Sequence, residues 1–266
     1  HQIPRSDLQY AFVTASIDYD KYRYYADFTD IGYLEVPDND SLSFVGTDLS
    51  FFCWINPIKL REEILSLSPT DPGDFINIVS KIDFGNPANG VEYDLRIKNN
   101  GGTISLQAFI ATDGSNYIQR TCELDTSLLE NWFSVGFSHE YSSSKIKVFV
   151  NGQQPSSTFS TIGTHTGMTN GTAPLTVGDR YYIRDAMLFS KYVSPTEALE
   201  LYNTIDVRNL SFYAQTLSYW KLASGKDSVG TNDGTIKENG KTINNENPPG
   251  QCFYSDQPLF SGYYDE

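Results

Sequence analysis

The sequence predicts an all-β fold, a sandwich of two antiparallel sheets with one short helix. Apolar and polar residues alternate along several segments, Asn-Gly turn signals follow two of these segments, and the aromatic residues include 18 Tyr and 16 Phe. Alternation with a period of two places one face of a strand against a core, and aromatic side chains suit the pleated surface of a sheet. Because only one helix accompanies many strands, a sandwich is favoured over an α/β fold.

The clearest element is a hairpin within residues 91–111, whose two strands are joined by an Asn-Asn-Gly-Gly turn. An Asn-Gly pair supplies the positive φ angles that a tight hairpin turn requires. In the first strand the apolar residues face the core, and the other face carries Glu92, Asp94, Arg96 and Lys98. Opposite charges in that order predict a solvated, salt-bridged surface.

Further strands are recognised as apolar runs that end at turn signals. They lie at residues 49–55, 132–139, 145–150, 175–177, 185–189 and 218–222. The side chains expected to be mostly buried between the sheets are Val91, Leu95, Ile104, Leu106, Phe133, Val135 and Val148.

The helix is predicted to begin at Ser194, within two residues. Ser194 and Glu197 form a capping box, in which the serine hydroxyl accepts from the Glu197 amide and the Glu197 side chain reaches back. Pro195 fits the first helical position because its missing N–H is not needed there.

Composition limits the classes of partner. The net charge of −14 repels phosphate, and no stripe of Lys or Arg offsets it, so nucleic acid and anionic membrane surfaces are excluded as partners. No apolar run approaches the roughly 18 residues of a membrane helix, so no membrane insertion is predicted. The negative charge is compatible with cation binding and with simple solubility.

The three cysteines, Cys53, Cys122 and Cys252, match no zinc or redox spacing. Their odd number leaves at least one thiol unpaired. Cys53 lies in an apolar run, where a buried and inert thiol is expected.

Six sequence pieces, in this order and spacing, resemble a laminin-G-like, concanavalin A-like domain of the pentraxin-type jelly-roll family. They are residues 30–37 (DIGYLEVP), 49–57 (LSFFCWINP), 131–135 (NWFSV), 147–152 (KVFVNG), 175–179 (LTVGD) and 185–189 (DAMLF). The resemblance implies a jelly roll that holds glycans or proteins on a concave sheet or on rim loops, often with calcium. It also implies a secreted, cell-surface or viral attachment protein.

The chain departs from this family in the order of two pieces. In the family, a Tyr-Trp-Lys-Leu strand and an Asp-Ser-x-Gly-x-Asn-Asp-Gly-Thr turn precede the Gly-Tyr-Leu-Glu-Val piece. Here they follow the helix, at residues 219–222 and 227–235. Either the order is circularly permuted or a second, truncated copy begins there. A fragment of about 50 residues buries little core alone, so permutation is favoured, with residues 219–222 pairing within the same sheets as residues 32–36.

One domain is therefore predicted for residues 1–247. Residues 248–266 are rich in Pro and aromatic residues and are predicted to form an irregular tail. Its apolar side chains need burial, against the chain itself or against a neighbour. The tail is therefore predicted to contact another chain in a homo-oligomer or a larger assembly.

A calcium site is predicted at Asp227, Asn232 and Asp233, which match the family's turn residue by residue. Calcium takes six to eight oxygens from carboxylates, amides and carbonyls on loops. Two further clusters have suitable residues, namely Asp38 with Asn39 and Asp40, and Asp113 with Asn116. All three also fit ordinary turn chemistry, because Asp, Asn and Gly favour turns without a metal.

Candidate ligand-binding residues are tyrosines that could stack on sugar rings. They are Tyr22, Tyr24 and Tyr25 in a Tyr-rich stretch, and Tyr181 and Tyr182 in a second pair. Tyrosine is rigid and amphipathic, so it serves binding surfaces well. The alternative is that these tyrosines are simply strand formers.

No catalytic pattern is evident. A glycosidase on this fold needs two carboxylates about 5–5.5 Å apart for retention, and no Glu-x-Asp-x-x-Glu run supplies them on one strand. His1, His139 and His165 have no Ser or Cys motif beside them.

The sequence therefore predicts a non-catalytic recognition or adhesion domain that binds a glycan, on an extracellular, cell or virion surface. The alternative is a structural protein of a virion or surface assembly, such as a decoration, fibre or capsid-associated protein. In that case the jelly roll would mediate protein–protein contacts.

Overall fold

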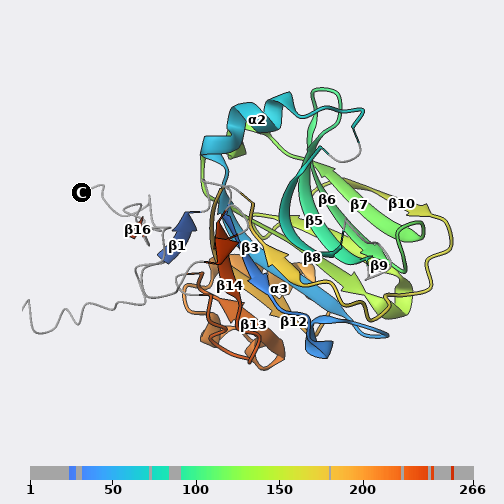
Figure 1. Cartoon of the computed structure of the whole chain (residues 1–266), viewed down its shortest axis with the longest axis vertical. Coiled ribbons are helices and arrows are strands. Elements are labelled where there is room, and N and C mark those ends of the chain that lie inside the picture. The colour runs from blue at the N-terminus through green and yellow to red at the C-terminus, as the bar shows by residue number, and fades with distance from the viewer. Residues whose placement is uncertain are drawn as a thin grey trace, which may run out of the picture.

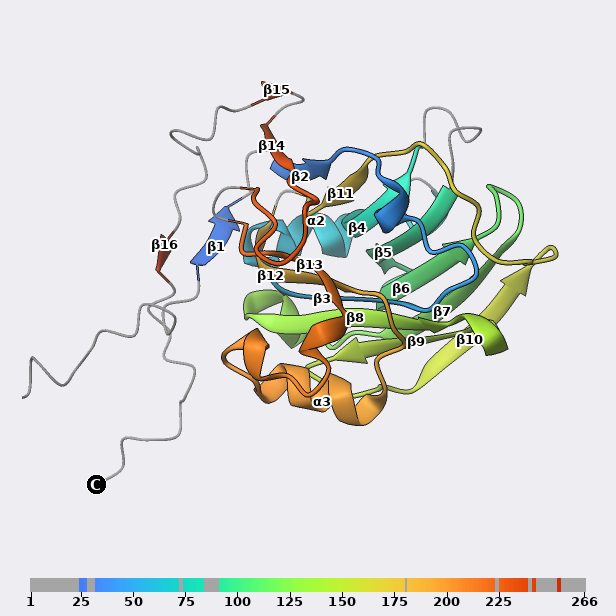
Figure 2. The same cartoon turned by 90° about the horizontal axis from the view of Figure 1, so that it is seen from below.

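The computed structural model describes residues 24–27, 32–71, 74–83, 91–179, 181–222, 225–238, 241–242 and 253–254. Two antiparallel sheets face each other, and a helix lies on the outer side of one of them (Figures 1 and 2). The predicted all-β sandwich is confirmed.

The first sheet has seven strands among the described residues, in the order β16-β1-β12-β3-β8-β9, with β13 also paired to β12. Its strands are β1 (Tyr24–Asp27), β3 (Leu49–Asn56), β8 (Phe133–Glu140), β9 (Lys145–Val150), β12 (Tyr182–Phe189), β13 (Thr216–Trp220) and β16 (Phe253–Tyr254).

The second sheet has nine described strands, in the order β10-β7-β6-β5-β4-β11-β2-β14-β15. Its strands are β2 (Gly32–Val36), β4 (Ile76–Ile82), β5 (Val91–Asn99), β6 (Ile104–Ala111), β7 (Tyr117–Glu123), β10 (Ser157–Ile162), β11 (Leu175–Val177), β14 (Thr235–Glu238) and β15 (Lys241–Thr242). The helices are α2 (Arg61–Ser66) and α3 (Pro195–Asn203), and short 3-10 turns lie at Asp40–Leu42, Ile58–Leu60, Thr126–Glu130, Tyr141–Ser143, Val207–Asn209 and Tyr213–Gln215.

The main core lies between the two sheets. Six of the seven predicted core side chains are at most 1% exposed, and the seventh, Val91, is only half-buried because it lies on the outer face of β5. Cys53 and Cys122 are buried free thiols in this core. Burial raises the pKa of Cys122 to about 11, so the thiolate is scarce at neutral pH.

The prediction of a solvated charged face on β5 is wrong at Glu92 and Asp94, since both are fully buried. The β4–β5 register shifts between Lys81 and Ile82, which interrupts the simple alternation at Glu92. Glu92 instead lies 2.8 Å from the buried Lys81. Loops close over the pair, because Glu92 also accepts from Ser43 Oγ and from the amide of Gly171.

The outer face of the seven-stranded sheet carries a second, smaller core beneath α3. Phe52, Phe149 and Phe189 from the sheet pack there with Ala198 and Leu201 of the helix. The layer order, helix then sheet then sheet, is clear in Figure 2.

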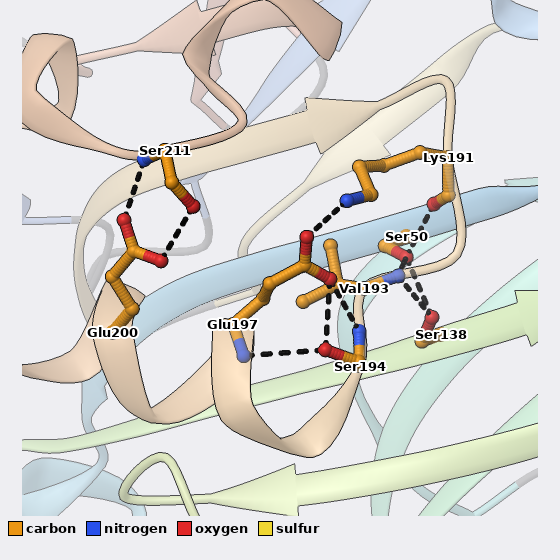
Figure 3. Close-up of polar contacts among 8 residues, drawn as sticks. All are labelled: Ser50, Ser138, Lys191, Val193, Ser194, Glu197, Glu200 and Ser211. Carbon is orange, nitrogen blue, oxygen red and sulfur yellow. Dashed lines mark hydrogen bonds and ion pairs between the residues drawn. The ribbon is translucent and has the colours of Figure 1, made fainter.

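The start of α3 is fixed as predicted. Ser194 Oγ accepts from the amide of Glu197, and Glu197 Oε2 accepts from the amide of Ser194, 2.9 Å away. The amide of Val193 donates to Ser50 Oγ and Ser138 Oγ of the sheet (Figure 3). The capping box therefore sits directly on a buried serine pair, which ties the helix to β3 and β8.

Helix α2 was not predicted from the sequence. It has only six residues and no side-chain cap, so it shows neither a periodic stripe nor a start signal. Its Ile64 is buried in the main core. Within the described part of the chain, no helix has the length and apolarity to cross a bilayer.

The C-terminal strands belong to the same sandwich. β13 pairs with β12, and β14 pairs with β2 in the opposite sheet. The expectation that residues 219–222 share a sheet with residues 32–36 is therefore wrong, although Trp220 is fully buried in the main core. Among the described residues of this region, β13 joins the first sheet, and β14 and β15 join the second.

Of the predicted tail, only Phe253–Tyr254 is described, and these residues pair with β1 of the same chain. The rest of residues 248–266 lies outside the described residues, so the contact with another chain and the boundary at residue 247 stay predictions.

A buried histidine lies beside the loop that follows β10. His139 in β8 is fully buried, and neither ring nitrogen has a hydrogen-bond partner among the described residues. The ring of His165 lies 6.3 Å away at a right angle. Burial and, less strongly, His165 lower the pKa of His139 to about 4, against the smaller opposing effects of Asp48 and Glu140.

We expect this histidine to make the protein sensitive to acid. The folded-state pKa of about 4 lies below the ordinary 6.5, so the unfolded chain binds the proton more readily. Stability is therefore retained above about pH 6.5 and lost as pH falls toward 4, by up to about 3 kcal/mol. Urea unfolding at pH 7 and pH 4.5 should show a smaller acid loss in His139→Leu than in the wild type. An equal loss in both would contradict the assignment.

Candidate functional site

The predicted tyrosines do not form one described surface. Tyr22 lies outside the described residues, and Tyr24 and Tyr25 belong to β1, opposite Tyr254 and Phe253 of β16.

Tyr181 and Tyr182 point to different environments. Tyr181 is 1% exposed, and its hydroxyl donates to the carbonyl of Asn77 at 2.8 Å. Its ring therefore belongs to the core and offers no face to a ligand. Tyr182 is half-buried, with Lys59 Nζ 4.9 Å from the centre of its ring.

The carboxylate of Asp227 is occupied by the backbone. Oδ1 accepts from the amides of Tyr219, Val229 and Gly230, and Oδ2 accepts from the amide of Asn232, all at 2.9–3.1 Å. Four N–H groups that donate to one carboxylate are typical of a turn, and here they fix this turn against β13.

The other two residues of this cluster complete the same turn. Asn232 is buried, its backbone carbonyl accepts from Trp220 Nε1 at 2.8 Å, and its side-chain Nδ2 donates to Ser218 Oγ. Asp233 accepts from the amide of Asp227 and from Lys226 Nζ, and the Lys226 hydrogen bond holds its pKa below the usual range.

These contacts do not fit a calcium site. Calcium needs six to eight oxygens that face one point, whereas these oxygens already accept from N–H groups around the turn. In the described ranges, no group of three or more His, Cys, Asp or Glu side chains is placed to share a metal ion. The geometry favours the turn interpretation of the cluster.

The two other predicted clusters are also engaged within the chain. Asp38 pairs with Lys81 at 2.7 Å, and Asn39 accepts from the amide of Ser41. Asp113 accepts from the amides of Ser115 and Asn116 in the loop after β6.

A pocket of about 250 Å³ opens on the outer face of the nine-stranded sheet. We call it the aromatic pocket; it is lined chiefly by Val91, Asp94, Arg96, Phe109, Ala111 and Tyr117. These residues come from β5, β6 and β7, which lie side by side (Figures 1 and 2).

The strand register explains why these side chains meet. Leu95 pairs with Ala108, and both are buried in the core between the sheets. Their neighbours Asp94 and Phe109 also pair, and they project to the opposite, outer face. One strand further, Ala111 pairs with Tyr117.

Arg96 lies between two rings. Its guanidinium carbon is 4.0 Å from the ring centre of Phe109 and 4.3 Å from that of Phe75. Stacking of this kind holds a guanidinium in one orientation and leaves its N–H groups at the edge. The rings of Phe109 and Tyr117 lie 5.4 Å apart, so an aromatic wall continues to the half-buried Tyr117.

Asp94 is the least compensated group of the pocket. It is fully buried, neither carboxylate oxygen has a hydrogen-bond partner among the described residues, and Arg96 Nε is 3.6 Å from Oδ2. That separation is too long for a good hydrogen bond. Burial raises the pKa of Asp94 to about 7, against the weaker opposing effect of Arg96.

The sequence placed Asp94 and Arg96 on one strand face but did not indicate a pocket. Phe109 lies within the predicted hairpin of residues 91–111, and no element was predicted at Tyr117. The signal that could have indicated the pocket was the presence of two aromatic residues, Phe109 and Tyr117, near the charged face of the predicted strand.

No family model matches the chain, and no curated protein matches its sequence. The chain is similar in structure to a candidate carbohydrate-binding protein from Bacteroides ovatus, with 17% identity and a TM-score of 0.48. That match covers 84% of this chain and 62% of the other.

Two other solved structures are similar at lower identity. One is a heptameric SAP-like pentraxin from Limulus polyphemus, with 10% identity, a TM-score of 0.42, and coverage of 81% of this chain and 94% of the other. The other is the CBM40 domain of an IT-sialidase from Ruminococcus gnavus bound to sialyllactose, with 10% identity, a TM-score of 0.43, and coverage of 68% and 100%. Likenesses at this level assign no function, and the family resemblance stays a prediction.

We expect Asp227→Ala to destabilise the fold whether or not calcium is present. Loss of the acceptor for four amides should cost about 2 kcal/mol, a decrease in Tm of roughly 4–8 °C for a chain of this size. Thermal melts in calcium and in EDTA should show the same decrease. If calcium raises the Tm of the wild type and the substitution removes that rise, the cluster is a metal site instead.

We expect Asp94→Asn to stabilise the protein above neutral pH. The folded-state pKa of about 7 exceeds the ordinary 3.8, so the wild type loses stability as pH rises between these values, by up to about 4 kcal/mol. Asparagine cannot ionise, so the Tm of Asp94→Asn should exceed that of the wild type at pH 8. The difference in Tm should be smaller at pH 5.

Asp113→Asn is the matched control, since hydrogen bonds from Asn116 and Ser115 lower the pKa of Asp113. It should lower the Tm at pH 8. If Asp94→Asn also lowers the Tm at pH 8, the conclusion that Asp94 is a buried carboxylate without compensating contacts is wrong.

Proposed function

We propose that the chain is a non-catalytic glycan-binding domain and that the aromatic pocket is its binding site. The observation that carries the proposal is the fixed Arg96 beside the unpartnered carboxyl of Asp94, next to the half-buried ring of Tyr117. Ligand pockets typically combine a mostly apolar wall with a few well-placed polar groups.

A sugar ring suits this arrangement chemically. Its C–H face can pack on the ring of Tyr117, and its hydroxyls can accept from the edge of Arg96, behind which the buried Asp94 carboxyl lies. The volume of about 250 Å³ suits one ring rather than a large ligand.

The pocket gives little support to hydrolysis. Besides the buried Asp94, its rim carries Asp83, which is itself engaged in an interaction, and Asp113. The Asp113 carboxylate already accepts from two backbone amides and from Asn116 Nδ2. A general base or nucleophile needs a carboxylate free to reach substrate or water. The extracellular, cell-surface or virion location stays part of the proposal, as implied by the family resemblance.

The test is binding to a glycan array, followed by titration of the best soluble hit, with and without EDTA. Tyr117→Ala should weaken that binding about tenfold, because it removes the stacking surface. Tyr141→Ala is the control, since Tyr141 is an exposed tyrosine elsewhere on the surface. No retained glycan, or equal affinity in wild type and Tyr117→Ala, would reject the site; release of sugar products would reject the non-catalytic role.

A further inference from the structure

A second hollow lies on the nine-stranded sheet, at the other end of β6 and β7. Its volume is about 820 Å³. We call it the hydroxyl hollow; it is lined chiefly by Thr103, Ser105, Thr121, Ser156, Ser157 and Thr158.

The strand register places both hollows on one face. Tyr117 of the aromatic pocket pairs with Ala111, and further along the same two strands Thr121 pairs with Gln107. Thr121 lies four residues after Tyr117 on β7, so both side chains project from the same, outer face. Thr158 of β10 pairs with Thr121 and extends this face to the edge of the sheet.

Between the two hollows, the outward side chains of β6 and β7 are uncharged, with Arg96 and Lys98 of β5 beside them. Gln107 and Phe109 of β6 are buried, so the half-buried Gln119 and Thr121 of β7 form most of the accessible surface. Outward-facing Gln119 pairs with Phe109, and its Nε2 donates to Thr121 Oγ1 at 2.8 Å. Gln107 Nε2 donates to Ser105 Oγ at 3.3 Å. On the outward positions of β6 and β7, both wholly described, Glu123 at the far end is the single charged residue.

This chemistry suits an uncharged polyhydroxylated chain. Amides and hydroxyls each donate and accept, as do the hydroxyls of a sugar. The run from Tyr117 to Glu123 measures roughly 20 Å at about 3.3 Å per residue, which is much longer than one sugar ring. A ligand that fills only the aromatic pocket would leave this face unused.

We infer that the site takes a linear, neutral oligosaccharide, bound along β7 from the aromatic pocket to the hydroxyl hollow. The inference rests on the proposed function and goes beyond it, because it specifies an extended segment of a polysaccharide rather than a single sugar. The aromatic pocket holds one ring, and the hydroxyl hollow holds units further along the chain.

The test titrates soluble cello-, manno- and xylo-oligosaccharides, from disaccharides to octasaccharides, against the whole chain. For the series that binds, affinity should rise with length before it levels off. Thr158→Trp should fill the hydroxyl hollow and lower the affinity for the longest member at least tenfold, while the disaccharide binds as before.

The matched control is Thr161→Trp. Thr158 and Thr161 are both exposed and lie on β10, but Thr161 pairs with the core residue Ile118 and so projects to the other face. Thr161→Trp should leave the affinity for every oligosaccharide unchanged, and both Trp variants should have the Tm of the wild type.

The outcomes separate the two proposals. If disaccharide and octasaccharide bind equally, or Thr158→Trp changes nothing while Tyr117→Ala weakens binding, the extended site is wrong and the proposed function stands. If glycans on the array bind but all of them are branched or charged, the inference that the ligand is a neutral, linear oligosaccharide is wrong. If no glycan binds and the wild type instead retains a peptide on the edge of β10, both proposals fail.

Discussion

The pleat of β5, β6 and β7 is the constraint on which both the fold and the proposed site depend. Each strand gives alternate side chains to the core, so the remaining ones must share the outer face. Leu95 and Ala108 seal the interior, while Asp94 and Phe109, one residue away, build the pocket. A slip of one residue in this register would exchange the two sets and lose core and site together.

The molecule treats its buried charges in two different ways. Lys81 and Glu92 lie in contact, and Glu92 Oε1 also accepts from two loop groups, so the burial of this carboxylate is partly compensated. Its other oxygen, Oε2, has no hydrogen-bond partner among the described residues. Asp94 has no hydrogen bond among the described residues and only a 3.6 Å ion pair with Arg96, whose guanidinium stacks between two rings. Uncompensated groups of this kind cost folding free energy and are concentrated where proteins bind ligands. Glu92 and Asp94 lie on the same strand, but only the carboxylate of Asp94 has no hydrogen bond at all from the described residues. This difference distinguishes the pocket from a structural ion pair.

Local signals explain what the sequence could predict. The hairpin within residues 91–111 and the capping box at Ser194 depend on neighbouring residues, and both formed as expected. Burial of an outward-facing residue such as Asp94 depends on what covers it from distant segments, which periodicity does not report. Asp227 shows the same limit, because a turn and a calcium loop use the same residue types. Only the positions of its four amide donors decide between them.

The pairing of β14 with β2 joins strands from opposite ends of the described chain. During synthesis, β2 emerges early and meets β11 much later, and its second edge stays open until β14 leaves the ribosome. Trp220, which fills the core from β13, arrives only shortly before. Such long-range closure slows folding and leaves unpaired strand edges exposed to other nascent chains. We therefore expect the yield of folded protein to rise when chaperones or slow, dilute expression shield the unfinished sheet until its last strands are in place.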